Sequence, residues 1–228
     1  MVGTQAVPAR LIISAAEPQQ FPSDRWCGSL NEAASLRSPK TGTLEEAAVF
    51  SEPKTATLEF AFLGRSNVGK SSLLNCLVRQ PGLAFTSARP GCTQLINFYQ
   101  VNDEVRFVDL PGYGYAQAPM TERARWKELI ESYLGERQCL ALSFLLIDAR
   151  RGWMDMDLDL KAWLEFHNRR YQVIVTKADK LKSNNQLKTG LAVIQERIPD
   201  QEPVPFSAID GRGVREIWQI ISKIKKQQ

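Results

Sequence analysis

Residues 64–71 read GRSNVGKS, and this short stretch decides the fold of the chain. Two glycines that bracket four residues allow consecutive backbone N–H groups to turn toward a phosphate, and the lysine adds a mobile positive charge. The apolar run at residues 58–63 predicts a buried strand before the loop, and leucines at helical spacing in residues 72–78 predict a helix after it. Strand, glycine loop and helix together point a helix N-terminus at an anion, whereas a chance glycine-rich turn would lack these flanks.

A second segment, DLPG at residues 109–112, follows the apolar strand predicted at residues 105–108. Asp109 can hold Mg²⁺ through a water molecule, since this ion keeps part of its hydration shell. Gly112 has no side chain, so its backbone N–H can approach the γ phosphate. A proline-glycine turn that closes a strand is the plainer interpretation, and it is compatible with this one.

Residues 86–94, between these two segments, are rich in small and turn-forming residues and lack apolar periodicity, which predicts a mobile loop. Thr93 is the candidate to add a hydroxyl to Mg²⁺ when the γ phosphate is present, so that the loop orders only in that state. One threonine is weak evidence by itself, and its place between the other segments strengthens it. The neighbouring Cys92 is better explained as incidental than as a redox switch.

A third segment, TKAD at residues 176–179, follows a strand predicted at residues 171–175. The carboxylate of Asp179 can accept hydrogen bonds from N1–H and the exocyclic amino group of guanine, a donor pair that adenine lacks. Lys177 can lay its aliphatic stem along the base. The corner at residues 206–208 can donate a backbone N–H to the guanine carbonyl. TKAD alone could be an exposed charge cluster, but five segments in this order predict a GTP site.

Strand and helix signals alternate along the chain, which predicts an α/β P-loop NTPase fold with a mostly parallel, twisted sheet and helices on both faces. Residues 96–101 and 105–110 read instead as a hairpin, which gives one antiparallel edge strand. Further predicted elements are a strand at 140–147 and helices at 121–134, 158–166, 187–198 and 214–224. Ligands of such sheets bind outside the carboxyl ends of the strands, where all the segments above fall.

The composition is that of an ordinary globular protein, with 43% hydrophobic and 24% charged residues among 228. No apolar run approaches the roughly 20 residues of a membrane helix. Residues 11–16 are too short for the apolar part of a signal peptide, so we expect a cytoplasmic protein without membrane contact. The four cysteines lack paired spacing and the single histidine excludes a histidine-based metal cluster within one chain.

Five runs resemble the EngB family, also called YihA or YsxC, of bacterial ribosome-associated GTPases in the TrmE-Era-EngA-EngB-septin-like superfamily. They are GRSNVGKSS (64–72), PGCTQLINFY (90–99), DLPGYGYA (109–116), TKADKL (176–181) and FSAIDGRG (206–213). The resemblance implies a GTP-binding protein that assists assembly of the large ribosomal subunit and is needed for normal cell division and septation. It also implies GTP or GDP bound with Mg²⁺, whose direct ligands would be Ser71 and Thr93.

The residues expected to contact nucleotide are Gly64, Arg65, Ser66, Asn67, Val68, Gly69, Lys70, Ser71, Ser72, Gly91, Cys92, Thr93, Gln94, Leu95, Asp109, Leu110, Pro111, Gly112, Thr176, Lys177, Ala178, Asp179, Phe206, Ser207 and Ala208.

The N-terminus departs from the family, whose members begin shortly before the phosphate loop. We therefore divide the chain into an N-terminal extension, residues 1–57, and an EngB-type G domain, residues 58–228. Residues 10–16 faintly resemble the family's opening edge strand, in which case residues 25–57 would be a mobile insertion. A disordered tail or a misplaced start codon are equally good interpretations.

Hydrolysis should be slow, because Tyr113 occupies the position where Ras-like enzymes carry the glutamine that orients the attacking water. Asn67 offers compensation: in related GTPases an asparagine at this place helps to hold K⁺, which acts where an arginine finger would. An arginine finger contributes roughly 10³ to 10⁵ in rate. We expect Lys70, Asn67, Thr93 and Gly112 to act in hydrolysis.

The net charge of +4 permits RNA binding without requiring it. Scattered basic residues could together form a phosphate-contacting face, although they more often make a solvated surface. The family resemblance supplies the expected partner, the large ribosomal subunit or its precursor, bound by a monomer. Two other classes stay open: a P-loop phosphotransferase acting on a small molecule, which Asp179 and the Thr93 loop oppose, and a GTP-binding scaffold in septation without useful turnover. The basic residues are Arg150, Arg151, Arg169, Arg170, Lys180, Lys182, Arg212, Arg215, Lys223, Lys225 and Lys226.

Overall fold

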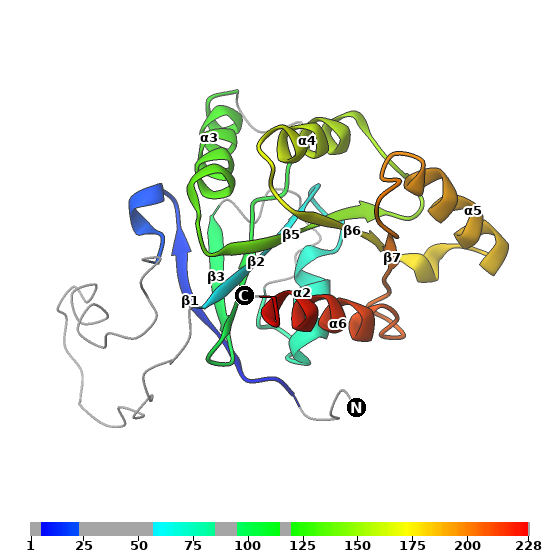
Figure 1. Cartoon of the computed structure of the whole chain (residues 1–228), viewed down its shortest axis with the longest axis horizontal. Coiled ribbons are helices and arrows are strands. Elements are labelled where there is room, and N and C mark those ends of the chain that lie inside the picture. The colour runs from blue at the N-terminus through cyan, green and yellow to red at the C-terminus, as the bar shows by residue number, and fades with distance from the viewer. Residues whose placement is uncertain (1–5, 23–56, 85–94, 115–119, 228) are drawn as a thin grey trace.

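The structure, a computed structural model, describes residues 6–22, 57–84, 95–114 and 120–227, except the side chains of residues 120, 122, 123 and 126. Seven strands form one sheet in the order β1-β3-β4-β2-β5-β6-β7 (Figure 1). The strands are β1 Ala9–Ala15, β2 Leu58–Gly64, β3 Ile96–Val101, β4 Val105–Asp109, β5 Leu140–Asp148, β6 Tyr171–Thr176 and β7 Val204–Pro205. The helices are α2 Lys70–Val78, α3 Met120–Glu136, α4 Asp155–Phe166, α5 Asn184–Gln195 and α6 Val214–Lys225, with short 3₁₀ turns η1 Pro18–Gln20 and η2 Ala178–Lys180.

The central strands β4, β2, β5, β6 and β7 are parallel, whereas β3 pairs antiparallel with both β4 and β1. The predicted fold class is therefore confirmed, with the antiparallel pairing confined to one side of the sheet. The predicted hairpin is β3 and β4, and the edge position outside it belongs to β1. Residues 23–56, which contain nearly all of the expected insertion, lie outside the described residues.

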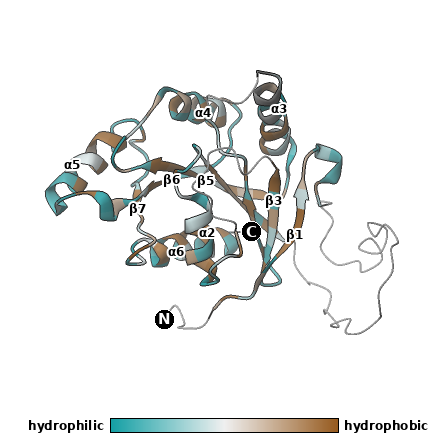
Figure 2. Ribbon diagram, turned by 180° about the vertical axis from the view of Figure 1, so that it is seen from behind, coloured by the Kyte–Doolittle hydropathy of each residue, from teal (hydrophilic) through white to brown (hydrophobic). Residues whose placement is uncertain are grey.

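Side chains alternate along β2 between two cores, as a strand buried on both faces requires. Phe60 and Phe62 pack with the leucines of α2 and the isoleucines of α6, whereas Ala61 and Leu63 pack with α3, α4 and α5. Helices consequently cover both faces, and Figure 2 shows hydrophobic colour concentrated on the strands between them. In the parts of the chain that the structure describes, no helix is both long and apolar enough to cross a membrane.

The N-terminal segment is joined to the sheet by main-chain bonds and by aromatic packing. The amide of Val7 donates to the carbonyl of Val78 and that of Asn102 to Pro8, both at 3.0 Å. Beyond β1, the ring of Phe21 lies 5.7 Å from the rings of Phe98 and Tyr133. Val7 packs against the core of Phe60 and Phe62, whereas Phe21 packs against the core of Ala61 and Leu63, so the N-terminal segment contributes to both.

A buried charge cluster lies at the amino ends of the strands, opposite the predicted nucleotide segments. Glu59 in β2 accepts hydrogen bonds from Arg106 at 2.6 Å, Arg137 at 2.7 and 2.8 Å, and the hydroxyl of Tyr133 at 3.0 Å. Burial alone would raise the pKa of Glu59, but the bonds and charges of Arg137 and Arg106 outweigh it and hold the pKa below its ordinary value. The cluster joins β2, β4 and the end of α3.

Candidate functional site

The phosphate loop lies at the carboxyl end of β2 and runs directly into α2. Its curvature depends on left-handed backbone at Asn67 (φ 61°) and Gly69 (φ 115°). Gly64 (φ 155°) begins the loop in close packing, since a Cβ there would lie 2.8 Å from Cγ1 of Val68. Such a turn places the N-terminus of α2, and the N–H groups around it, at the edge of the sheet where a phosphate would bind.

Lys70 and Asp109 are buried together beneath the loop. Nζ of Lys70 donates to the carbonyl of Gly64 at 3.2 Å, and the carboxylate of Asp109 ends the neighbouring strand β4. Burial raises the pKa of Asp109 to about 6 against the opposing charge of Lys70, and burial likewise lowers the pKa of Lys70. Two opposite charges held in a nonpolar interior indicate a site built for a charged ligand.

The donor set fits Mg²⁺. Oδ1 of Asp109 is buried and has no hydrogen-bond partner among the described atoms, and Ser71 follows Lys70 in the first turn of α2. Hard oxygen ligands of this kind suit Mg²⁺, which when bound would neutralise phosphate charge. The predicted third ligand, Thr93, lies outside the described residues, as do Gly91, Cys92 and Gln94. Leu95 is described and exposed, immediately before β3.

The TKAD segment is fastened to the phosphate loop by two side chains. The hydroxyl of Thr176 donates to the carbonyl of Val68 at 2.7 Å. Nζ of Lys177 donates to the carbonyl of Asn67 at 2.5 Å and forms an ion pair with Asp148 at 2.9 Å. The base-reading segment and the phosphate-binding segment are therefore one unit.

Asp148, at the end of β5, is a site residue that the sequence analysis missed. Its carboxylate accepts hydrogen bonds from Nε and Nη2 of Arg150, and it also forms the ion pair with Lys177. Burial acts to raise the pKa of Asp148, but the bonds from Arg150 and Lys177 hold it well below the ordinary range. An acid ending the apolar run 140–147 was the available signal. A cavity of about 200 Å³ lies here, lined by both arginines of residues 150–151, the phosphate loop and Lys177.

The predicted guanine corner lies beside TKAD, because β6 and β7 are parallel neighbours. The amide of Ala178 donates to the carbonyl of Phe206 at 3.1 Å, and the amide of Phe206 donates to Val175 at 2.8 Å. The hydroxyl of Ser207 accepts from the amides of residues 209 and 210, which fixes the turn. Asp179 is partly exposed at this corner, where its carboxylate can meet a base.

The DLPG segment contacts the phosphate loop directly. The amide of Ser66 donates to the carbonyl of Tyr113 at 2.9 Å, and its hydroxyl donates to the carbonyl of Gly112 at 3.1 Å. A Cβ at Gly112 would lie 2.9 Å from backbone atoms of Ser66, so only glycine fits this approach. The same segment borders a mostly apolar cavity of about 350 Å³ between α3 and α4.

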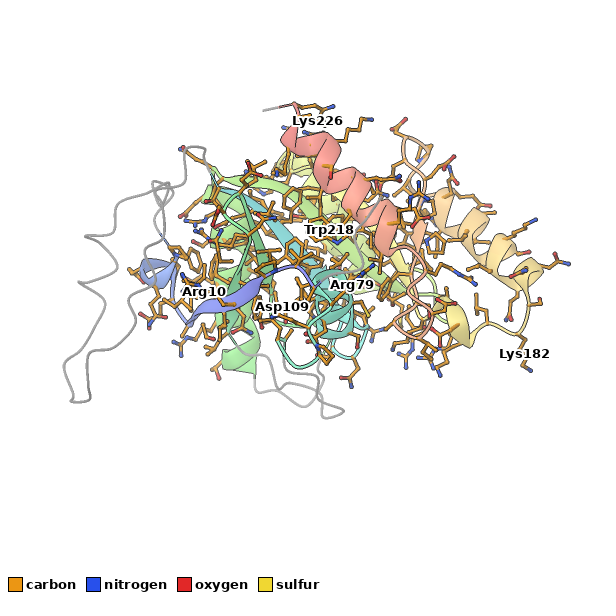
Figure 3. The ribbon with its side chains drawn as sticks, turned by 90° about the horizontal axis from the view of Figure 1, so that it is seen from below. Arg10, Arg79, Asp109, Lys182, Trp218 and Lys226 are labelled. Carbon is orange, nitrogen blue, oxygen red and sulfur yellow. The ribbon has the colours of Figure 1, made fainter. Side chains whose placement is uncertain are left out.

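The basic residues form two sets rather than one face, which corrects the expectation of a single phosphate-contacting surface. One set follows the carboxyl ends of the strands. The other set precedes the amino end of β6 or lies at the end of α6. The first set is Arg150, Arg151, Lys180, Lys182, Arg212 and Arg215, and the second is Arg169, Arg170, Lys223, Lys225 and Lys226. In Figure 3 Lys226 lies at the top and Lys182 at the lower right, well apart from each other. Four of these residues also pair within the molecule: Arg150 with Asp148, Lys180 with Asp179, Arg212 with Asp210 and Lys225 with Glu104.

Comparison with known proteins agrees with this geometry. Residues 59–177 match the family model described as 50S ribosome-binding GTPase. A probable GTP-binding protein EngB of Solibacter usitatus is 46% identical over 217 residues, which cover 95% of this chain and 96% of that one. A probable GTP-binding protein EngB of Syntrophus aciditrophicus is 46% identical over 165 residues, 72% of this chain and 84% of that one.

Solved structures share the fold. A crystal structure of a probable GTP-binding protein EngB superposes with a TM-score of 0.62 at 23% identity, covering 75% of this chain and all of that one. Era of Aquifex aeolicus, bound to GDP and AlF₄⁻, superposes with a TM-score of 0.60 at 26% identity over 73% of this chain and 56% of that one. The P-loop architecture is thereby confirmed.

Proposed function

Because the chain belongs to the EngB family of GTP-binding proteins and is a GTPase, we propose that it acts as a slow GTP-driven switch in assembly of the large ribosomal subunit. In this role the GTP and GDP forms have different affinities for a pre-ribosomal surface. If assembly of the large subunit failed, the shortage of ribosomes would impair cell division and septation. A ribosomal partner would place the protein in the cytoplasm.

One observation carries the nucleotide part of the proposal: the segment that reads the base is bonded to the loop that holds the phosphates. Lys177 reaches both the carbonyl of Asn67 and the carboxylate of Asp148, and Thr176 reaches Val68. The distance between the two halves of the site is thus fixed by side chains. We assign guanine recognition to Asp179 and the corner at residues 206–208, and phosphate binding to residues 64–72 and Gly112.

The metal part of the proposal assigns Mg²⁺ to the hydroxyl of Ser71 and, through water, to Asp109, with Thr93 added in the GTP form. The unpartnered buried oxygen of Asp109 supports this. For K⁺ we propose Asn67, whose left-handed backbone lies in the middle of the phosphate loop. Lys70 would neutralise phosphate charge in hydrolysis.

The ribosomal part rests on family membership and on the matched model, which is described as a 50S ribosome-binding GTPase. A relative of similar fold, Era, has been crystallised with a segment of 16S ribosomal RNA, which indicates what that protein binds. The two basic sets give this chain two edges able to contact RNA phosphates. Either would bind in a salt-dependent manner, because neutralised phosphates release counterions.

Co-sedimentation with purified large subunits tests the proposal. We expect the protein to pellet with subunits in the presence of a non-hydrolysable GTP analogue, to remain largely in the supernatant with GDP, and to be released steeply by added salt. Lys70→Ala should lose the nucleotide dependence. Equal co-sedimentation with GTP analogue and GDP would indicate a scaffold. No co-sedimentation in either nucleotide state, together with phosphate transfer to a small molecule, would indicate a phosphotransferase.

A further inference from the structure

Tyr113, the residue that follows the DLPG segment, donates its hydroxyl hydrogen bond to Oδ1 of Asp157 at 2.8 Å. Asp157 lies in the first turn of α4 and is only 2% exposed. Its other oxygen accepts from the amide of Met154 at 3.1 Å, which fixes the carboxylate at the start of the helix. The tyrosine is therefore attached to a helix that no nucleotide-reading segment includes.

The main chain of Tyr113 is held at the opposite side by the phosphate loop. Its carbonyl accepts from the amide of Ser66, and the preceding carbonyl, of Gly112, accepts from the hydroxyl of Ser66. Arg65 continues the contact, because it forms a parallel bridge with Tyr113 and its guanidinium reaches the sulfur of Met154. Three attachments thus fix residues 112–113 between the phosphate loop and α4.

The hydroxyl of Tyr113 is consequently engaged by α4 and is not offered to an attacking water. We propose that Tyr113 and Asp157 are positioning residues, which hold the backbone of Gly112 ready for the γ phosphate. This inference rests on the nucleotide site assigned above. A donor fixed before binding avoids the entropy cost of ordering it when GTP arrives.

The consequence concerns the choice between GTP and GDP. GDP lacks the γ phosphate, so its affinity depends on the phosphate loop, TKAD and the guanine corner, none of which the Tyr113 hydroxyl contacts. GTP affinity additionally depends on the Gly112 N–H. Loosening residues 112–113 should therefore weaken GTP binding and leave GDP binding unchanged.

The experiment measures dissociation constants of fluorescent GDP and of a fluorescent non-hydrolysable GTP analogue, with Mg²⁺, for the full chain. Tyr113→Phe removes only the hydroxyl, and we expect the preference for GTP over GDP to fall about three- to tenfold, the range of one lost hydrogen bond. Tyr171→Phe is the matched control, since Tyr171 donates to Glu165 at 2.7 Å on the surface, far from the site. Its preference should equal that of the wild type.

Asp157→Asn provides the second arm, because it can still accept from Met154 but replaces the oxygen that faces Tyr113. We expect a loss of preference no larger than that of Tyr113→Phe, because the amide can still donate to the phenol oxygen, and no further loss in the double variant Tyr113→Phe with Asp157→Asn. An unchanged or increased preference for GTP in Tyr113→Phe overturns the inference, and so does an equal loss for both nucleotides, which a purely structural role would give. Failure of the wild type to bind guanine nucleotides would instead overturn the proposed function.

Discussion

Thr176 and Val68 are joined by a buried hydrogen bond of 2.7 Å from the threonine hydroxyl to the valine carbonyl. The two residues are 108 positions apart in the chain, and they belong to the segments that read the base and the phosphates. A hydroxyl that is buried and bonded in this way fixes the spacing between the two halves of a bound nucleotide. The consequence is that affinity for the whole nucleotide depends on a residue that need not touch it.

Thr176→Val should weaken GDP and GTP binding alike, because the isosteric change leaves the carbonyl of Val68 buried without its donor. Loss of a buried partner costs about 1–3 kcal/mol. Titration with a fluorescent guanine nucleotide measures the loss, and thermal unfolding of the ligand-free protein separates it from general instability. Thr189→Val, at an exposed position of α5, is the control. Equal affinity in Thr176→Val and wild type would remove the role given to this bond.

Gly112→Ala should impair hydrolysis far more than GDP binding. The added Cβ would lie 2.9 Å from backbone atoms of Ser66, so the DLPG segment must move away from the phosphate loop. Loss of one positioned donor to a transferring group costs on the order of 10² in turnover. Single-turnover hydrolysis measures it. Gly190→Ala in α5, where a Cβ meets nothing within 4 Å, is the control and should not slow turnover. Wild-type turnover in Gly112→Ala would contradict the assignment.

Local hydrophobic patterns predicted the strands and helices, because each pattern reflects which side chains of that segment are buried. The alternation and apolar runs of β2, β4, β5 and β6 follow from strands buried on both faces. Boundaries were less accurate where polar residues begin a helix. α5 starts at Asn184 rather than residue 187, because Ser183 caps a first turn that has no apolar side chain. α4 starts at Asp155 rather than residue 158, and the side chain of Asp157 accepts from the amide of Met154 at its start.

The site was predictable where a motif names its own chemistry and unpredictable where two distant residues meet. The sequence shows Asp155, Asp157 and Asp159 as three similar acids in one helix, yet only Asp157 is buried, and its partner Tyr113 is 44 positions away. For Asp148 the acid at the end of the apolar run 140–147 was a local signal, but its pairing with Lys177 joins two strand ends. Long-range pairs of this kind depend on the order of strands, which no local pattern encodes.

Glu59→Gln should be strongly destabilising. It removes the negative charge from a cluster that holds the nearly buried guanidiniums of Arg106 and Arg137. Breaking a buried ion pair on one side costs about 3–5 kcal/mol. Urea unfolding at neutral pH measures it. Glu165→Gln, at an exposed pair with Lys161, should change the free energy of unfolding by less than about 1 kcal/mol. Similar effects in the two variants would contradict the importance of the cluster.

The pH dependence of stability follows from the same carboxylate. The pKa of Glu59 is below its ordinary value of 4.5 in the folded protein, so folding is favoured by its ionisation. This contribution is fully present above about 4.5 and is lost as the pH falls through the lower folded pKa. The wild type should therefore lose stability on acidification more steeply than Glu59→Gln. Parallel acid profiles from urea unfolding would show that other groups control the transition.

Asp179→Asn should shift the preference from guanine toward xanthine nucleotides. The amide can donate to the C2 carbonyl of xanthine but no longer accepts from the amino group of guanine. Loss of a hydrogen bond to a charged group costs about 1.5–3 kcal/mol, roughly ten- to a hundredfold in affinity. Competition between GDP and xanthosine diphosphate measures the shift. Asp200→Asn, at an exposed position after α5, should keep the guanine preference, and an unaltered preference in Asp179→Asn would refute base reading by this carboxylate.

Asn67 provides the test of K⁺ activation. Asn67 is exposed in the middle of the phosphate loop and lines the cavity there, and the hydroxyl of Tyr113 is bonded to Asp157 and does not serve the water. Wild-type hydrolysis should be faster in KCl than in NaCl of equal ionic strength, with the roughly 10³ to 10⁵ of an arginine finger as the upper limit. Asn67→Gly removes the side chain and tolerates the φ of 61° better than alanine. This variant should hydrolyse GTP equally slowly in both salts. It should still bind GDP, because the backbone carbonyl of residue 67 that Lys177 contacts is unchanged. Equal wild-type rates in the two salts would contradict K⁺ activation and would indicate that the ribosomal partner supplies the activating group.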